Sequence, residues 1–388
     1  MKIKRRIFSV VLMLSMIIAM FPRNSFITFK ASAYEVDMNS RLIYDVLSDG
    51  IIIRSFMPPK NFNGSLTIPD TINGIQVTMI GQNAFSGMES LKSITVPYCI
   101  KGIGSGAFAS CKNLKTFSVS EDTSDGKKIA VKASSESIDG IKISAFNNCT
   151  SLSSITIPNG IKSIEETAFY YCISLKKIDI PNNVVSVGDL AFAYCEKLKS
   201  VTLSENLKDI GRLAFSSCTS LIKITIPEKV TVISENLFNS CTVLESVSLP
   251  KNLAKIESYA FLNCTSLKKI VIPDSVKSIG EGAFVNCESL ASVNIPKKTT
   301  AIEKYTFRNC EMLSSITIPE NITKICDSAF GGCVSLTSVT IPSSVKIIGK
   351  DIFAECENIT IVGAKGSYAE TYAKDNNIDY KKLVTKKK

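Results

Sequence analysis

The sequence contains no histidine and no tryptophan among its 388 residues. Without histidine, Ser-His-Asp and Cys-His nucleophiles, imidazole metal ligands and histidine general bases are all excluded. The chain also lacks a P-loop, a glycine-rich phosphate loop and a Ca²⁺-binding motif. Carboxylates are plentiful, but no two of them stand out as a glycosidase pair. We therefore expect no enzymatic activity, no catalytic residue, no metal site and no cofactor.

Positive charge is scarcer than the formal net charge of +10 suggests. Residues 1–33 hold six of the 45 basic residues and no Asp or Glu. The rest of the chain therefore carries 39 basic and 35 acidic side chains, a net charge of +4. So small an excess, spread over a long chain, does not make a phosphate-binding footprint. We expect no nucleic-acid partner.

Long apolar runs are missing after residue 33, but one precedes it. A basic stretch, Lys2–Arg6, is followed by the apolar run Ile7–Phe21 and then by Ala31-Ser32-Ala33. This order is typical of a secretory signal peptide with small residues before the cleavage site. An uncleaved membrane anchor is the alternative, but the run is shorter than the roughly 20 residues that span a bilayer. We expect cleavage after Ala33 and a secreted or extracellular chain, either free or cell-surface-associated, without a transmembrane segment.

A strict internal repeat dominates the remaining sequence. One phenylalanine recurs with a 23-residue period, except for a single 38-residue step that contains a 15-residue insertion. Such a period indicates stacked coils that cannot bury their apolar faces alone. The column consists of Phe85, Phe108, Phe146, Phe169, Phe192, Phe215, Phe238, Phe261, Phe284, Phe307, Phe330 and Phe353.

Other residue types keep phase with this column. Cysteine stands three residues after the Phe in 11 of 12 coils, and leucine stands six after it in 11 of 12. Apolar residues follow at nine and eleven, as in Ile270 and Ile272, and this alternation is typical of a half-buried strand. Pro273 then ends the strand, and Val276 and Ile279 add core residues after a turn. Equivalent strands of successive coils should therefore lie parallel in a continuous sheet.

The repeat resembles the BspA-like bacterial surface leucine-rich repeats. The matching pattern covers about residues 62–363 and reads Ile272-Pro273-x-x-Val276-x-x-Ile279-Gly280-x-x-Ala283-Phe284-x-x-Cys287-x-x-Leu290. The resemblance implies an α/β-type repeat solenoid, a right-handed superhelix with a continuous parallel β-sheet and 12 coils of the 23-residue repeat. One departure is that no Asn or Cys follows the strand at the usual asparagine-ladder position.

The chain divides into four expected regions. Residues 1–33 form the signal peptide, 34–78 an N-terminal cap, 79–363 the solenoid with its insertion at about 120–137, and 364–388 a C-terminal cap with a basic tail. Caps are expected because the terminal coils of a solenoid would otherwise expose apolar surface. A short helix is expected over 366–374.

The 13 cysteines raise the question of disulfides in an exported chain. Eleven share one column, so their Cβ vectors should run parallel, which makes the disulfide torsion unfavourable. Eleven is also odd, and Cys99 and Cys326 fall at unrelated phases. Buried cysteine packs as a small hydrophobe. We favour a ladder of free structural thiols, with scattered disulfides or a metal site as the alternatives.

Two places could bind a ligand. The outward positions of the strand column, eight and ten after each Phe, are mostly Ser, Thr and Lys, which either keep the sheet soluble or form an extended binding face. The insertion contains a turn at Asp125-Gly126 flanked by Lys127 and Lys128, which is a candidate binding loop or neutral variation. The candidate strand-face residues are Lys177, Asp179, Ser200, Thr202, Lys223, Thr225, Ser246, Lys269 and Thr317.

The family resemblance implies a surface-associated protein that adheres to host proteins or other cells. On this interpretation the chain is an exported, monomeric interaction protein whose partner is an extracellular protein or another cell-surface macromolecule. The alternative from a different class is a structural spacer of the cell envelope that binds nothing saturably. The two interpretations predict the same fold. A pull-down from the extracellular environment distinguishes them, because a spacer should capture no partner saturably.

Overall fold

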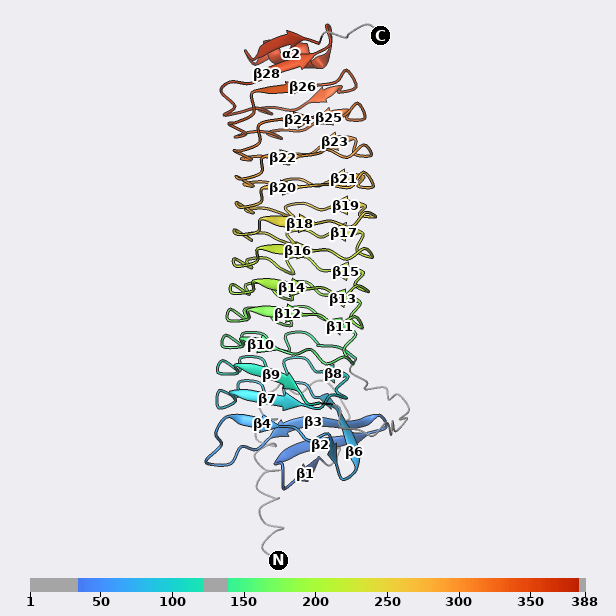
Figure 1. The fold of residues 1–388 in the computed structure, drawn as a ribbon, viewed down its shortest axis with the longest axis vertical. Coiled ribbons are helices and arrows are strands. Elements are labelled where there is room, and N and C mark those ends of the chain that lie inside the picture. Colours follow the sequence, from blue (N-terminus) through green and yellow to red (C-terminus); the bar gives the residue numbers. More distant parts are fainter. Residues whose placement is uncertain (1–33, 122–138, 384–388) are drawn as a thin grey trace, which may run out of the picture. The chain divides into compact units, whose positions relative to one another are not determined.

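The computed structural model of the protein describes residues 34–121 and 139–383. The expected signal peptide and the candidate loop residues Asp125, Gly126, Lys127 and Lys128 lie outside the described residues. From Glu35 onward the chain forms one compact unit. Its coils lie one above another in sequence order (Figure 1).

A first ladder of short parallel strands runs along the coils, with one strand in each. In the Phe coils these strands occupy the positions predicted from the alternation after each Phe. The residue between the two outward positions is buried, as Ile224 is between Lys223 and Thr225, except that Ile155 and Val201 are half-buried. The strands are β4 (Ser65–Thr67), β7 (Ser93–Val96), β9 (Thr116–Val119), β10 (Ser154–Ile155), β12 (Lys177–Asp179), β14 (Ser200–Thr202), β16 (Lys223–Thr225), β18 (Ser246–Ser248), β20 (Lys269–Ile270), β22 (Ser292–Val293), β24 (Ile316–Thr317), β26 (Ser338–Thr340), β28 (Thr360–Gly363) and β29 (Asp379–Lys382).

The repeat solenoid of stacked coils is thus confirmed, and it extends by one strand beyond the Phe coils at each end, through β4 and β29. Strand pairing in the first ladder falls into four segments: β4 to β10, β12 with β14, β16 to β22, and β24 to β29. Helix is confined, among the described residues, to α2 (Tyr368–Asp375) after the last coil. The coils themselves consist of strands and turns.

A second parallel ladder lies on another side of the coils (Figure 1). The sequence pattern predicts only a turn with two core residues in this region, whereas Ser278–Ile279 pairs in register with Lys255–Ile256. Its strands are β3 (Gly50–Phe56), β6 (Ile75–Ile80), β8 (Gly102–Ile103), β11 (Ser163–Ile164), β13 (Ser186–Val187), β15 (Asp209–Ile210), β17 (Val232–Ile233), β19 (Lys255–Ile256), β21 (Ser278–Ile279), β23 (Ala301–Ile302), β25 (Lys324–Ile325) and β27 (Ile347–Ile348).

The segment from two residues before each Phe to two residues after it, here named the turn segment, closes the coil on a third side. At each of the eleven steps from Phe85 to Phe353, three backbone N–H groups of the turn segment donate to carbonyl oxygens of the next coil. For Phe192 these are the N–H groups of Leu190, Phe192 and Tyr194, at 2.8, 2.8 and 2.9 Å from their acceptors. This hydrogen bonding is unbroken where the strand pairing is segmented, so the turn segments join the coils continuously.

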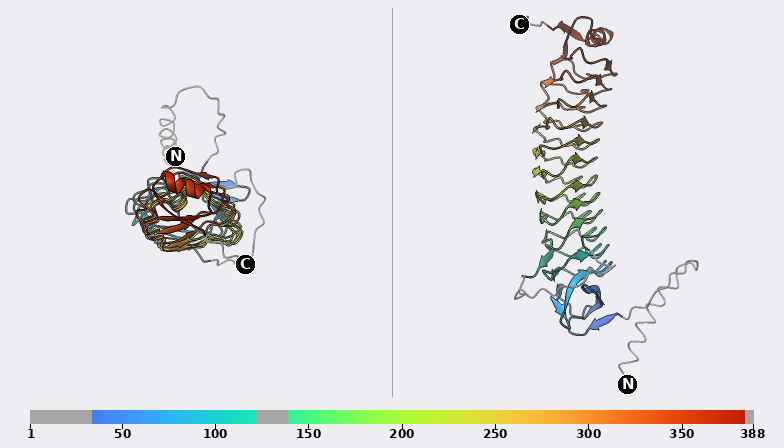
Figure 2. Two further views of the ribbon diagram at one scale, coloured as in Figure 1. Left: turned by 90° about the horizontal axis from the view of Figure 1, so that it is seen from above. Right: turned by 90° about the vertical axis from the view of Figure 1, so that its right-hand side faces the viewer.

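In the view along the stack the coils superimpose closely (Figure 2).

The turn segment requires an unusual backbone. In every coil the residues two before and two after the Phe have positive φ, between 51° and 74°. This left-handed conformation costs a non-glycine residue roughly 1–2 kcal/mol, and it is least expected for a β-branched or bulky side chain. Thr167, Leu190, Leu213 and Tyr305 nevertheless adopt it. The hydrogen bonds to the next coil and the buried Phe between the two positions hold the segment in this shape.

The core follows the predicted phenylalanine column. Successive rings stack with centroids 5.0–6.0 Å apart and interplanar angles of 1–19°. The step across the insertion, Phe108 to Phe146, keeps the 5.0 Å spacing, so the extra residues leave the core unchanged. Eleven of the twelve rings are at most 1% exposed, and Phe353, in the last of these coils, is 4% exposed.

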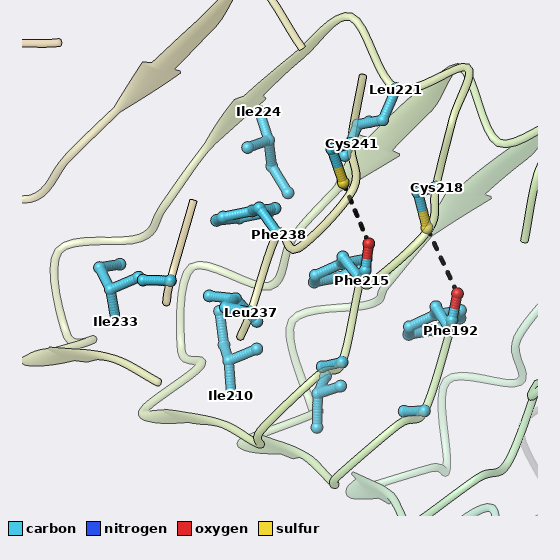
Figure 3. Packing of buried hydrophobic residues seen from close by; sticks show 14 of the residues in the cluster. Phe192, Ile210, Phe215, Cys218, Leu221, Ile224, Ile233, Leu237, Phe238 and Cys241 are labelled. Carbon is cyan, nitrogen blue, oxygen red and sulfur yellow. Dashed lines mark hydrogen bonds between the residues drawn. The ribbon is translucent and has the colours of Figure 1, made fainter. Parts of the chain in front are cut away.

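The cysteine column has a role that packing alone did not suggest. Each of its eleven thiols donates to the carbonyl oxygen of the Phe in the preceding coil at 3.0–3.3 Å, as Cys241 does to Phe215 and Cys218 to Phe192 (Figure 3). The same Phe215 carbonyl also accepts the N–H of Cys218 in its own coil. The thiol therefore adds a second hydrogen bond to a carbonyl that already accepts one, which an alanine or valine side chain could not supply. All thirteen cysteines are free thiols in the structure.

Different elements adjoin the first and last coils. At the start, β2 (Leu42–Leu47) pairs antiparallel with β1 (Glu35–Asp37) on one side and with β3 on the other. β3 pairs parallel with β6 and so joins the second ladder, and β5 (Thr71–Ile72) pairs antiparallel with β6. At the end, α2 buries Ala369 and Ala373, and its Tyr372 hydroxyl accepts the N–H of Ile352 at 3.1 Å. The expected short helix lies within two residues of its predicted range.

Candidate binding surface

The candidate strand-face residues all lie on the first ladder and are exposed. The pleat directs alternate side chains outward, so Lys177, Asp179, Lys223 and Thr225 face solvent while the residues between them enter the core. Parallel pairing aligns the outward positions of neighbouring coils, as in Lys177 with Ser200 and Asp179 with Thr202.

The structure brings most of these residues together in two groups. Lys177, Asp179, Ser200 and Thr202 lie on the paired strands β12 and β14. Lys223, Thr225, Ser246 and Lys269 lie on the paired strands β16, β18 and β20, with Lys223 beside Ser246 and Ser246 beside Lys269. Thr317 lies apart on β24, which pairs with β26 rather than with β22.

Two of the candidates engage each other. The Lys177 ammonium lies 2.8 Å from a carboxylate oxygen of Asp179, two residues along the same strand. Hydrogen bonding from Lys177, followed by that from Thr202, holds the pKa of the Asp179 carboxyl below its ordinary value. Both side chains are more than half exposed, so a ligand can compete for either partner at low cost. Lys223 and Lys269 supply the ammonium groups on β16 and β20.

The face offers hydroxyls and ammonium groups with some apolar surface between them. Val271, at the outward position ten residues after Phe261, is 63% exposed, and Ile222, next to the outward Lys223 of β16, is 47% exposed. Such a surface can make many individually weak hydrogen bonds along successive coils.

A surface aromatic cluster on the turn segments, with Tyr171 and Tyr194 exposed and Tyr170 half-buried, was not predicted from the sequence. Tyr170, Tyr171 and Tyr194 lie on adjacent coils, with ring centroids 5.5–6.3 Å apart. They stand one or two residues after Phe169 and Phe192, where other coils mostly carry Ser, Asn, Ala or Gly. That departure from the column was the available signal.

Burial makes the column thiols poor nucleophiles and poor metal ligands. Burial raises the pKa of the Cys241 thiol to about 12, and burial together with the neighbouring Cys149 raises the pKa of Cys111 to about 12. The thiolate, which is the nucleophile and metal ligand, is therefore disfavoured at neutral pH. Within residues 34–121 and 139–383, no three His, Cys, Asp or Glu side chains are grouped as a metal site requires.

One surface depression lies away from the strand face, and another adjoins its first strand, β4, through Thr67. One, of about 460 Å³, is lined by Asp327, Lys350, Tyr372 and Asn376, among others, where α2 meets the last coils. The other, of about 450 Å³, lies near β1 and β5 and includes Asp37 and Asn73. None of the candidate strand-face residues lines either depression.

No helix in the described part of the chain has the length and apolar character that a bilayer crossing demands. The family model for the BspA type leucine rich repeat region matches residues 55–133, 126–245 and 232–360. No curated protein matches the chain.

Solved structures of leucine-rich repeat proteins are similar to it. One from Bacteroides ovatus is 24% identical, with a TM-score of 0.61, and the match covers 91% of this chain and 100% of the other. A leucine-rich cell surface protein of Faecalibacterium prausnitzii is 29% identical, with a TM-score of 0.49 and coverage of 89% and 98%. The pneumococcal vaccine antigen PcpA is 18% identical, with a TM-score of 0.49 and coverage of 92% and 99%.

The family model spans most of the chain, and the periodic features that it describes are the ones that build the coils. Leucine-rich repeat folds generally bind other proteins. The chain belongs to the BspA-type leucine-rich repeat family.

Proposed function

We propose that this chain is exported, remains associated with the cell surface and mediates protein–protein or cell adhesion through the strand face of its first ladder. Its partner is an extracellular protein or another cell-surface macromolecule, and the chain acts as a monomer without catalytic activity or cofactor. Within residues 1–33, the basic start, the apolar run and Ala31-Ser32-Ala33 support export.

One observation carries the proposal: the outward residues of the first ladder repeat in register from coil to coil. Lys177 pairs with Ser200, Lys223 with Ser246, and Lys269 with both Ser246 and Ser292. Each exposed hydrogen bond contributes only about 0.5–1.5 kcal/mol, so affinity must come from a partner that spans several coils or from many displayed copies.

The test removes side chains that neighbouring coils show to be dispensable for folding. Lys177→Ser, Lys223→Ser and Lys269→Ser copy the serines beside them in the ladder, and Thr202→Ala and Thr225→Ala remove two hydroxyls. This five-residue variant should retain the fold. It should weaken binding at least tenfold, which corresponds to about 1.4 kcal/mol. Thr225→Ala alone should change binding little.

The matched control removes the same charge from the second ladder. Lys208→Ser, Lys255→Ser and Lys324→Ser change three exposed lysines at or within that ladder, and Lys255 also pairs with a carboxylate two residues away, as Lys177 does. Purified proteins are used to capture extracellular proteins, which are quantified by mass spectrometry. A partner held equally by all three proteins would refute the strand-face proposal, and absence of any saturable partner would favour the spacer interpretation.

A further inference from the structure

The tyrosine cluster is the densest exposed aromatic surface described in the coils. Tyr171 and Tyr194 stand at equivalent positions of adjacent coils, 41% and 39% exposed, with ring centroids 6.2 Å apart. Tyr170 lies with its ring at 69° to that of Tyr194, at 5.5 Å. The rings rest on turn segments whose backbone is fixed by hydrogen bonds to the next coil, such as that from Tyr171 to Ala193 at 2.9 Å. The backbone that carries the cluster is therefore held in place before any ligand arrives.

The two positions that carry the cluster are polar but uncharged in the neighbouring coils. Along the two positions that carry it, one and two residues after the Phe, the preceding coil supplies Asn147 and Asn148 and the following coils supply Ser217 and Asn239. No charged residue occupies either position in the coils from Phe85 to Phe284. Tyrosine thus presents apolar ring faces and phenol hydroxyls among amides and hydroxyls.

We propose that Tyr170, Tyr171 and Tyr194 form a binding site for neutral carbohydrate. A pyranose ring has an apolar face of C–H groups that packs on an aromatic ring, while its hydroxyls exchange hydrogen bonds with amides and hydroxyls. The cluster offers both kinds of contact side by side. An anionic polymer would need a cation, and neither position of the flanking coils provides one.

This site lies on a different side of the coil from the proposed adhesion face. The first ladder lacks exposed aromatic side chains at its outward positions, which excludes sugar stacking there, whereas the turn segments supply it. The two surfaces can therefore act independently. A glycan held by the turn segments leaves the strand face open to a protein.

The variant that tests the site copies residues the chain already uses in the same backbone conformation. Tyr171→Ser and Tyr194→Ser reproduce Ser217, which stands at the equivalent position with φ of 58°, against 61° for both tyrosines. Tyr170→Ala reproduces Ala193 of the next coil. The control, Tyr305→Ser, removes a tyrosine at another left-handed position, where Ser328 stands in the next coil. Circular dichroism checks that each variant is folded.

Immobilised protein is exposed to dextran, starch, yeast mannan and xylan as neutral probes, and to heparin and poly-L-proline as rivals. We expect at least one neutral polysaccharide to bind, the triple variant to bind it at least tenfold more weakly, and Tyr305→Ser to bind it normally. Binding of none of the four, or equal binding by the triple variant, would overturn the proposal. The proposal would also be overturned if the natural protein bound poly-L-proline or heparin but no neutral glycan, and the triple variant lost that binding. The cluster would then be assigned to a peptide or a polyanion.

Discussion

Alkaline pH should unfold this protein through its cysteine column. Burial raises the pKa of the Cys241 thiol from 9.0 to about 12, and it raises the pKa of Cys218 and Cys264 in the same direction. A group whose pKa rises on folding contributes its full stabilisation below its unfolded pKa and loses it as the pH climbs toward the folded value. The sensitive window therefore opens near pH 9.

The magnitude follows from the linkage relation. At pH 10 the unfolded chain gains about 1.4 kcal/mol from ionising one such thiol, because each pH unit above the unfolded pKa is worth about 1.36 kcal/mol. Eleven column thiols together would withdraw up to about 15 kcal/mol, more than the whole stability of most domains. Between pH 8 and 10 the free energy of unfolding should fall by about 1.3 kcal/mol for each thiol.

The variant Cys218→Ser, Cys241→Ser and Cys264→Ser isolates this effect. A serine hydroxyl can still donate to the Phe carbonyl of the preceding coil but does not ionise in this range. Urea unfolding followed by circular dichroism, with a reductant present, measures both proteins at pH 8, 9 and 10. The natural chain should lose about 4 kcal/mol more than the variant between pH 8 and 10. All other side chains are the same in both proteins, so equal losses would show that the thiols are not buried as described.

Further predictions concern the turn segment, the core and export. Gly282→Ala should lower the free energy of unfolding more than Gly87→Ala does. Both glycines have positive φ, but only at Gly282 would a Cβ meet a side chain, the Tyr259 ring. Equal losses of stability in urea unfolding would contradict this packing. Phe215→Ala should cost about 3–5 kcal/mol, because the ring is fully buried between two others, and a loss below about 1 kcal/mol would contradict that burial. The intact mass of exported protein should correspond to a chain beginning at Tyr34, and a mass that includes residues 1–33 would refute cleavage after Ala33.

The sequence was most informative where one residue type recurs at a fixed period. The phenylalanine, cysteine and leucine columns predicted the buried face, and the alternation around Ile270 predicted the first ladder. The second ladder was missed because its buried residues, such as Val276 and Ile279, stand three apart and do not show the strand alternation of Ile270 and Ile272. The turn segment was missed as a hydrogen-bonded element because its left-handed positions hold Leu, Tyr and Thr as well as Gly and Asn, so no glycine column marks them.

The surfaces were harder to predict for a different reason. Outward positions such as Lys177 and Thr202 follow directly from the strand pattern, but the ion pair between Lys177 and Asp179 depends on side-chain geometry. The tyrosine cluster requires knowing that positions one repeat apart, such as Tyr171 and Tyr194, lie on neighbouring coils with their rings exposed on the same side. The thiol donation to Phe carbonyls needs the offset between coils, which no single repeat contains.

The backbone bonds between successive turn segments all run one way, and this gives the stack an electrical direction. The three N–H groups that each turn segment donates across to the next coil point the same way at every step, so their peptide dipoles add as they do along an α-helix, with the partial positive charge at the end near Phe353. In eleven coils the two left-handed positions are uncharged, whereas in the last coil they are Asp351 and Glu355. Two carboxylates thus stand at the positive pole, as acidic residues do in the first turn of a helix.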